Sequence, residues 1–105
     1  MRDIEVYETG ETEGGWEFHV VVRDGTGATE HRVSLNRPYW ELLTGGPARN
    51  SLGEGGRHNR DELVRRSFEF LLARESKESI LPAFNLRDIT RYFPEYEQEI
   101  KKRFL

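Results

Sequence analysis

The stretch WEFHVVVRDGTGATEHRVSL, residues 16–35, decides the fold of this chain. Apolar and polar residues alternate on both sides of a Gly-rich turn, the pattern of two half-buried strands in a hairpin. A two-residue loop at 25–26 fixes the register, and it pairs Trp16 with Leu35, Phe18 with Val33 and Val20 with His31. We therefore predict a hairpin with one apolar face and one polar face.

A third strand precedes this hairpin. Residues 3–8 alternate in the same way, and Ile4 and Val6 extend the apolar face. With strands at about 3–8, 16–23 and 28–35, the first third of the chain reads as a three-stranded antiparallel meander.

The rest of the chain has helical spacing. Asn36 is the expected N-cap of a short helix that Gly45 ends. The main helix is expected from Asn59, which has capping-box spacing to Glu62, and it should run to about Glu75.

The C-terminal third predicts further helical turns. Ile80, Leu81 and Phe84 are expected in a buried connection. Asn85 is the expected cap of a turn whose apolar residues are Leu86, Ile89, Tyr92 and Phe93. A last helix from about Pro94 places Tyr96, Ile100 and Phe104 on one stripe, which is expected to pack on the protein's own sheet.

We accordingly expect one α+β domain spanning residues 1–105. Its N-terminal meander is covered on one face by three to four C-terminal helices. A Gly-rich flexible loop is expected at about 45–58, where almost no residue is suited to burial.

Composition excludes several kinds of protein. The chain has no cysteine, so it forms no disulfide and no cysteine-based zinc site. No apolar run is long enough for a signal sequence or a membrane span, and we expect a cytoplasmic protein without membrane contact. Residues 1–35 hold three basic and eight acidic side chains, whereas the net charge of the whole chain is -3. The acidic charge is thus concentrated in the predicted meander.

Several segments resemble a group of small uncharacterised prokaryotic proteins that have no assigned activity. The similar segments are LTGG at 43–46, ELV at 62–64, SFEFLL at 67–72, KESIL at 77–81 and YFPEY at 92–96. Their residues are of core, cap and turn types. The resemblance therefore implies an architecture, and it implies no catalytic position.

The sequence contains few residues in a pattern typical of catalysis, metal binding or phosphate binding. No pair of histidines has metal-ligand spacing, no serine has a nucleophile context, and the glycines at 53–56 lack the lysine of a phosphate loop. We predict no catalytic residue, no metal and no cofactor. His31 is the exception, because it falls on the apolar face, and with Trp40 it could line a ligand pocket between sheet and helices.

Nucleic-acid binding is an alternative that the composition disfavours. The helical half contains Arg65, Arg66, Arg87 and Arg91, but acids interleave with these arginines. The polar face of the meander has Tyr7 as its one clear aromatic, whereas base stacking needs several.

We therefore expect a non-enzymatic protein-interaction or regulatory domain. The expected contacts are a sheet edge or the C-terminal helix, with a second copy or another protein as the partner. The alternatives are a nucleic-acid-associated regulator acting through the four arginines, and a small ligand-binding protein or enzyme using His31.

Overall fold

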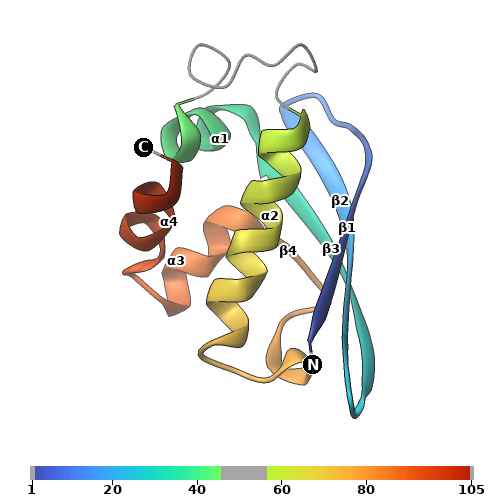
Figure 1. Ribbon diagram of the computed structural model, residues 1–105. Coiled ribbons are helices and arrows are strands. Elements are labelled where there is room, and N and C mark those ends of the chain that lie inside the picture. The colour runs from blue at the N-terminus through green and yellow to red at the C-terminus, as the bar shows by residue number, and fades with distance from the viewer. Residues whose placement is uncertain (1, 46–56, 105) are drawn as a thin grey trace.

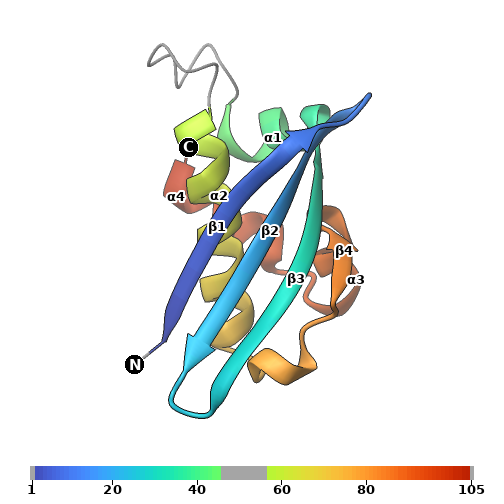
Figure 2. The ribbon, with the colours of Figure 1, turned by 90° about the vertical axis from the view of Figure 1, so that its right-hand side faces the viewer.

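The protein is a sheet covered on one face by helices. The computed structural model describes residues 2–45 and 57–104, and at residues 57 and 58 it describes the backbone alone. Helices pack against one face of the sheet (Figure 1), and Figure 2 looks onto the opposite face, which no described helix covers. The elements are β1 (Asp3–Glu11), β2 (Gly15–Asp24), β3 (Gly27–Asn36), α1 (Arg37–Thr44), α2 (Arg57–Leu72), η1 (Lys77–Ser79), β4 (Ala83–Asn85), η2 (Leu86–Asp88), α3 (Ile89–Tyr92) and α4 (Tyr96–Phe104). This α+β arrangement confirms the predicted fold class.

The meander has the predicted register. Asp24 pairs with Gly27 around the two-residue loop, and the apolar pairs are Trp16 with Leu35, Phe18 with Val33 and Val20 with His31. These side chains are buried and form the sheet side of the core. A Cβ at Gly15 would lie 1.9 Å from the carbonyl oxygen of Leu35, so glycine is required for β2 and β3 to meet there.

The sheet also has a fourth strand that was not predicted. β4 pairs in parallel with β3, with Ala83 opposite Arg32 and Asn85 opposite Ser34. The pairing is extended by a bond of 2.8 Å from the Arg32 amide to the Pro82 carbonyl. Because three residues are too few to show a period of two, we had expected only a buried connection here.

α1 follows the prediction, whereas α2 corrects it. α1 ends before Gly45, whose φ of 84° is left-handed. α2 begins at Arg57 and ends at Leu72, so Asn59 lies inside the helix and is not its cap. Asn59 Oδ1 instead accepts a hydrogen bond of 2.6 Å from Trp40 Nε1. Of the loop expected at 45–58, residues 57 and 58 are helical and residues 46–56 lie outside the described residues.

The C-terminal elements complete the core. Asn85 caps η2 as predicted, since its Oδ1 accepts from the Arg87 amide while Asp88 Oδ2 accepts from the Asn85 amide. α4 begins at Tyr96, whose hydroxyl lies 2.6 Å from Ser67 Oγ on α2. Ser67 donates its own hydrogen to the carbonyl of residue 63, so Tyr96 is the donor in that pair. This bond and the burial of Tyr96 fix α4 against α2.

Candidate functional site

His31 is buried in β3, and both of its ring nitrogens have protein partners. Nδ1 lies 2.8 Å from the carbonyl oxygen of Leu81, and Nε2 lies 2.8 Å from Oγ1 of Thr29. Because a carbonyl only accepts, Nδ1 carries a proton and donates to Leu81, while Nε2 and the Thr29 hydroxyl share the second hydrogen bond. His31 therefore ties the segment around Leu81 to β3, and neither nitrogen is left for a ligand.

Trp40 lies elsewhere in the core. It is fully buried, and its ring meets Trp16 edge to face with 5.2 Å between centroids. Trp16 pairs with Leu35, whereas His31 pairs with Val20 further along β2 and packs against Phe68. His31 and Trp40 thus belong to different parts of the core and do not form one site.

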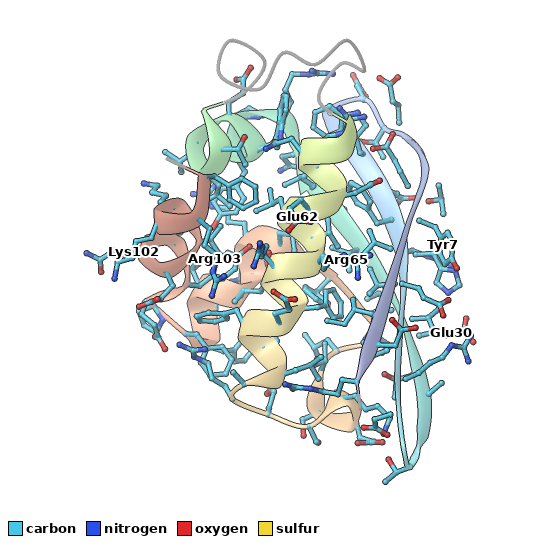
Figure 3. The ribbon with its side chains drawn as sticks, in the orientation of Figure 1. Tyr7, Glu30, Glu62, Arg65, Lys102 and Arg103 are labelled. Atoms are coloured by element: carbon cyan, nitrogen blue, oxygen red, sulfur yellow. The ribbon has the colours of Figure 1, made fainter. Side chains whose placement is uncertain are left out.

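The four predicted arginines are not gathered on one surface. Arg65 points from α2 toward β1 (Figure 3), where it donates to the carbonyl of residue 4. Arg66 pairs with two glutamates of its own helix, and Arg91 Nε lies 4.0 Å from Asp88 Oδ1. Arg87 faces a separate cleft beside α1. Arg65 and Arg66 therefore have structural partners within the protein, and Arg91 is only loosely paired.

The sheet edges are less open than predicted. β4 covers part of the β3 edge, so β3 is not an outer strand over Arg32–Ser34. β1 remains an outer strand, but its four charged side chains are Asp3, Glu5, Glu8 and Glu11. Two of these carboxylates are already paired within the protein, Glu5 with Arg23 and Glu8 with Arg60. Asp3 and Glu11 therefore supply the charge that guards this edge.

The stripe on the C-terminal helix packs inside the protein, but chiefly against α1, α2 and α3 rather than on the sheet as expected. Tyr96 and Ile100 are buried, and Phe104 is partly buried against the same core. Tyr39 of α1 donates a hydrogen bond of 2.9 Å to Glu97 Oε2 on α4. This stripe is therefore part of the core and offers no free apolar face to a partner.

An apolar pocket lies between η1, β4 and α3. Its volume is about 240 Å³, and it opens beside two exposed apolar side chains, Leu81 at 46% and Tyr92 at 65% exposure. The other apolar wall residues are Leu71, Ile80, Phe84, Ile89 and Phe93. We call this site the apolar pocket.

Two carboxylates line the apolar pocket. Asp88 is held by η2, because its Oδ2 accepts a hydrogen bond of 3.1 Å from the Asn85 amide. Glu75 also lines the pocket, and it makes no ion pair with any described residue. The pocket therefore joins an apolar floor to a negative rim.

The sequence did not reveal this pocket. Leu81 was expected in a buried connection, and that expectation is wrong, while Tyr92, one of the apolar residues of the turn capped by Asn85, is exposed. α3 has only four residues, so Tyr92 lies at its end and turns away from the core. The available signal was the closeness of Pro94, which ends the helix early.

Neither a membrane span nor a metal centre is found in the part of the chain that the structure describes. No helix there is both long and apolar enough to cross a bilayer. No group of three or more histidine, aspartate or glutamate side chains there is arranged to hold a metal ion.

Comparison of the chain with models of known families, with curated proteins and with solved structures finds no match.

Proposed function

We propose that the protein is a non-enzymatic interaction domain whose apolar pocket binds a segment of another protein. The segment carries a large apolar side chain that enters the pocket and a lysine or arginine beside it. The observation that carries the proposal is the apolar pocket itself, with Leu81 and Tyr92 exposed at its mouth.

Exposed apolar groups beside a pocket favour a protein partner. Four large apolar side chains among the described residues are exposed, and two of them, Leu81 and Tyr92, border this one pocket. Apolar patches that surround a pocket are typical of docking sites, and buried aromatic anchors supply much of the binding energy at such sites. The volume of about 240 Å³ suits one or two side chains.

The negative rim supports the choice of a basic partner. Glu75 and Asp88 both line the pocket, and the nearby Arg91 is 79% exposed and only loosely paired with Asp88. A lysine or arginine next to the anchor would approach Glu75 without displacing an existing ion pair. An acidic neighbour would meet two carboxylates, so charge selects among apolar segments.

The lining supports binding more than catalysis. It contains no histidine and no lysine, and its hydroxyls are the phenol of Tyr92 and Ser79 Oγ, which lies 3.1 Å from Ser76 Oγ. General acid–base or nucleophilic chemistry needs a nucleophile within reach of a base. The two carboxylates remain suited to recognising a cation.

A panel of labelled synthetic peptides tests this proposal by fluorescence anisotropy. Each peptide carries one phenylalanine or leucine, flanked by lysine, serine or glutamate. We expect saturable binding of the lysine-flanked peptides and about tenfold weaker binding of the glutamate-flanked ones. Absence of saturable binding by every peptide at millimolar concentration would contradict the proposal, and so would equal binding of the three charge classes.

Matched variants locate the binding surface. Tyr92→Ala and Glu75→Lys should each weaken binding of the lysine-flanked peptide about tenfold. Tyr7→Ala and Glu41→Lys are controls, since Tyr7 is 51% exposed on the uncovered sheet face and Glu41 is exposed on α1. If the controls weaken binding as much as the pocket variants, the pocket is not the site. A labelled RNA that binds more tightly than every peptide would instead favour nucleic acid as the partner.

A further inference from the structure

A second concave site lies between α1, η2 and α4, on the other side of η2 from the apolar pocket. It has a volume of about 620 Å³, and the turn between β1 and β2 borders it at Gly14. We call it the mixed cleft, because Pro38, Tyr39 and Leu42 form an apolar wall while Arg87 and Glu97 supply opposite charges. Leu42 is 48% exposed, so part of that wall is open to solvent.

The carboxylate of the mixed cleft is held in place. Tyr39 is 6% exposed, and its hydroxyl donates a hydrogen bond of 2.9 Å to Glu97 Oε2. Burial and this hydrogen bond raise the pKa of Tyr39, so the phenol stays neutral and keeps donating at physiological pH. The second oxygen of Glu97 has no partner among the described residues and can accept from a ligand.

The guanidinium of the mixed cleft is unpaired. Arg87 is exposed, and its side chain makes no ion pair or hydrogen bond with any described residue. By contrast, Arg66 and Arg74, which lie elsewhere in the protein, pair with glutamates. The backbone of Arg87 is nevertheless fixed, because its amide donates to Asn85 Oδ1 at 3.0 Å and its carbonyl accepts from Thr90.

We propose that the mixed cleft binds a small zwitterion with an apolar side chain, of which a free hydrophobic α-amino acid is the simplest case. Its carboxylate pairs with Arg87, its ammonium with the open oxygen of Glu97, and its side chain lies against Leu42 and Pro38. A simple anion would be repelled by Glu97 and a simple cation by Arg87, so the pair of charges selects a ligand that carries both.

Isothermal titration of the full chain with leucine tests this inference. We expect saturable binding of leucine, and at least about tenfold weaker binding of leucinamide, which lacks the carboxylate, and of N-acetylleucine, which lacks the ammonium. Glycine should also bind more weakly, because it offers nothing to Leu42. Absence of saturable binding by leucine and phenylalanine at millimolar concentration would overturn the inference, as would equal binding of leucine and its two analogues.

Two variants test the assigned residues. Arg87→Gln and Glu97→Gln should each weaken leucine binding about tenfold, and glutamine at 97 can still accept from Tyr39. The matched controls are Arg91→Gln and Glu99→Gln, which alter exposed charges outside the cleft and should leave binding unchanged. Equal losses in variants and controls would contradict the assignment. A failure of leucine to bind at the mixed cleft would leave the proposed peptide binding at the apolar pocket untouched, because the two sites share no lining residue.

Discussion

Lys77 is a buried lysine that holds η1 against the β2–β3 hairpin. It is 3% exposed, and its Nζ lies 2.9 Å from Asp24 Oδ1, 2.6 Å from Glu78 Oε2 and 2.6 Å from Thr26 Oγ1. Since η1 leads directly into Ile80 and Leu81, this contact sets the position of one wall of the apolar pocket. The buried ammonium group of Lys77 therefore helps to hold one wall of the apolar pocket in place.

The Lys77 contacts predict a pH-dependent effect of Lys77→Met. Hydrogen bonds from Lys77 and Thr26 lower the pKa of Asp24 below its ordinary value of 3.8, and the bond from Lys77 lowers that of Glu78 below 4.5. Carboxylates with lowered pKa contribute their full stability above their ordinary values of 3.8 and 4.5, and this stability is lost as the pH falls from those values through the lowered pKa of the folded state. Bonds to Glu78 and Asp24 raise the pKa of Lys77 above 10.5, so its contribution is complete below that value.

We therefore expect Lys77→Met to lower the urea midpoint at pH 7, and the difference from the parent protein to narrow at about pH 3. Lys102→Met is the control, because Lys102 is 69% exposed and should change neither midpoint. An equal difference at both pH values would contradict the account of Asp24 and Glu78.

The face on which a residue lies could be predicted from the sequence, but its tertiary contacts could not. The apolar face containing His31 followed from the strand period, but its bonds to Thr29 and the Leu81 carbonyl did not, because Leu81 is distant in sequence. Exposure of Tyr92 depends on where α3 ends, and a single helical turn has too few residues to show a period.

α2 is joined to β1 by a buried ion pair. Arg60 Nε lies 2.9 Å from Glu8 Oε1, and Arg60 Nη2 lies 3.1 Å from Glu8 Oε2. The side chains are 7% and 12% exposed, and the guanidinium lies 4.1 Å from the Trp16 ring centroid. The helix and the edge strand therefore meet through a charge pair in a largely apolar setting.

Breaking this pair should cost stability. Glu8→Leu leaves the Arg60 charge buried without its carboxylate, and we expect the free energy of unfolding to fall by about 3 kcal/mol. The double variant Glu8→Leu with Arg60→Met should lose less than the sum of the two single variants, because the buried guanidinium is then removed together with the carboxylate that it binds. Urea unfolding measures all three.

Glu11→Leu is the control on the same strand, because Glu11 is exposed. This substitution should change the free energy of unfolding by no more than about 0.5 kcal/mol. Strictly additive losses in the double variant would show that Glu8 and Arg60 are not energetically coupled.

At the scale of elements, long periodic segments were predictable and short ones were not. The meander and its register followed from alternation around one turn, and α1 followed from its flanking residues. The start of α2 was misplaced because Asn59 has the composition of a cap but bonds to Trp40, a tertiary contact. The apolar pocket is built largely from η1, β4, η2 and α3, the four shortest elements, and so the candidate site was the least predictable part.

The molecule as a whole has unequal faces. Tyr7 and Glu30 lie on the uncovered side of the sheet, whereas Lys102 and Arg103 lie on α4 at the opposite side (Figure 3). The apolar pocket belongs to the helical half of the chain. Residues 57–105 are weakly basic overall, whereas the two charged residues that line the pocket, Glu75 and Asp88, are acidic. This arrangement favours docking of one basic, apolar segment at the pocket over pairing of two acidic sheets.

A titration of the 15N-labelled protein with the lysine-flanked phenylalanine peptide, followed by NMR, tests this claim most directly. The account predicts that the amide shifts cluster at Leu81, Phe84, Ile89 and Tyr92, and that Tyr92→Ala removes them at the same peptide concentration. Shifts that cluster along β1 or α1, or no shift at saturating peptide, would contradict it.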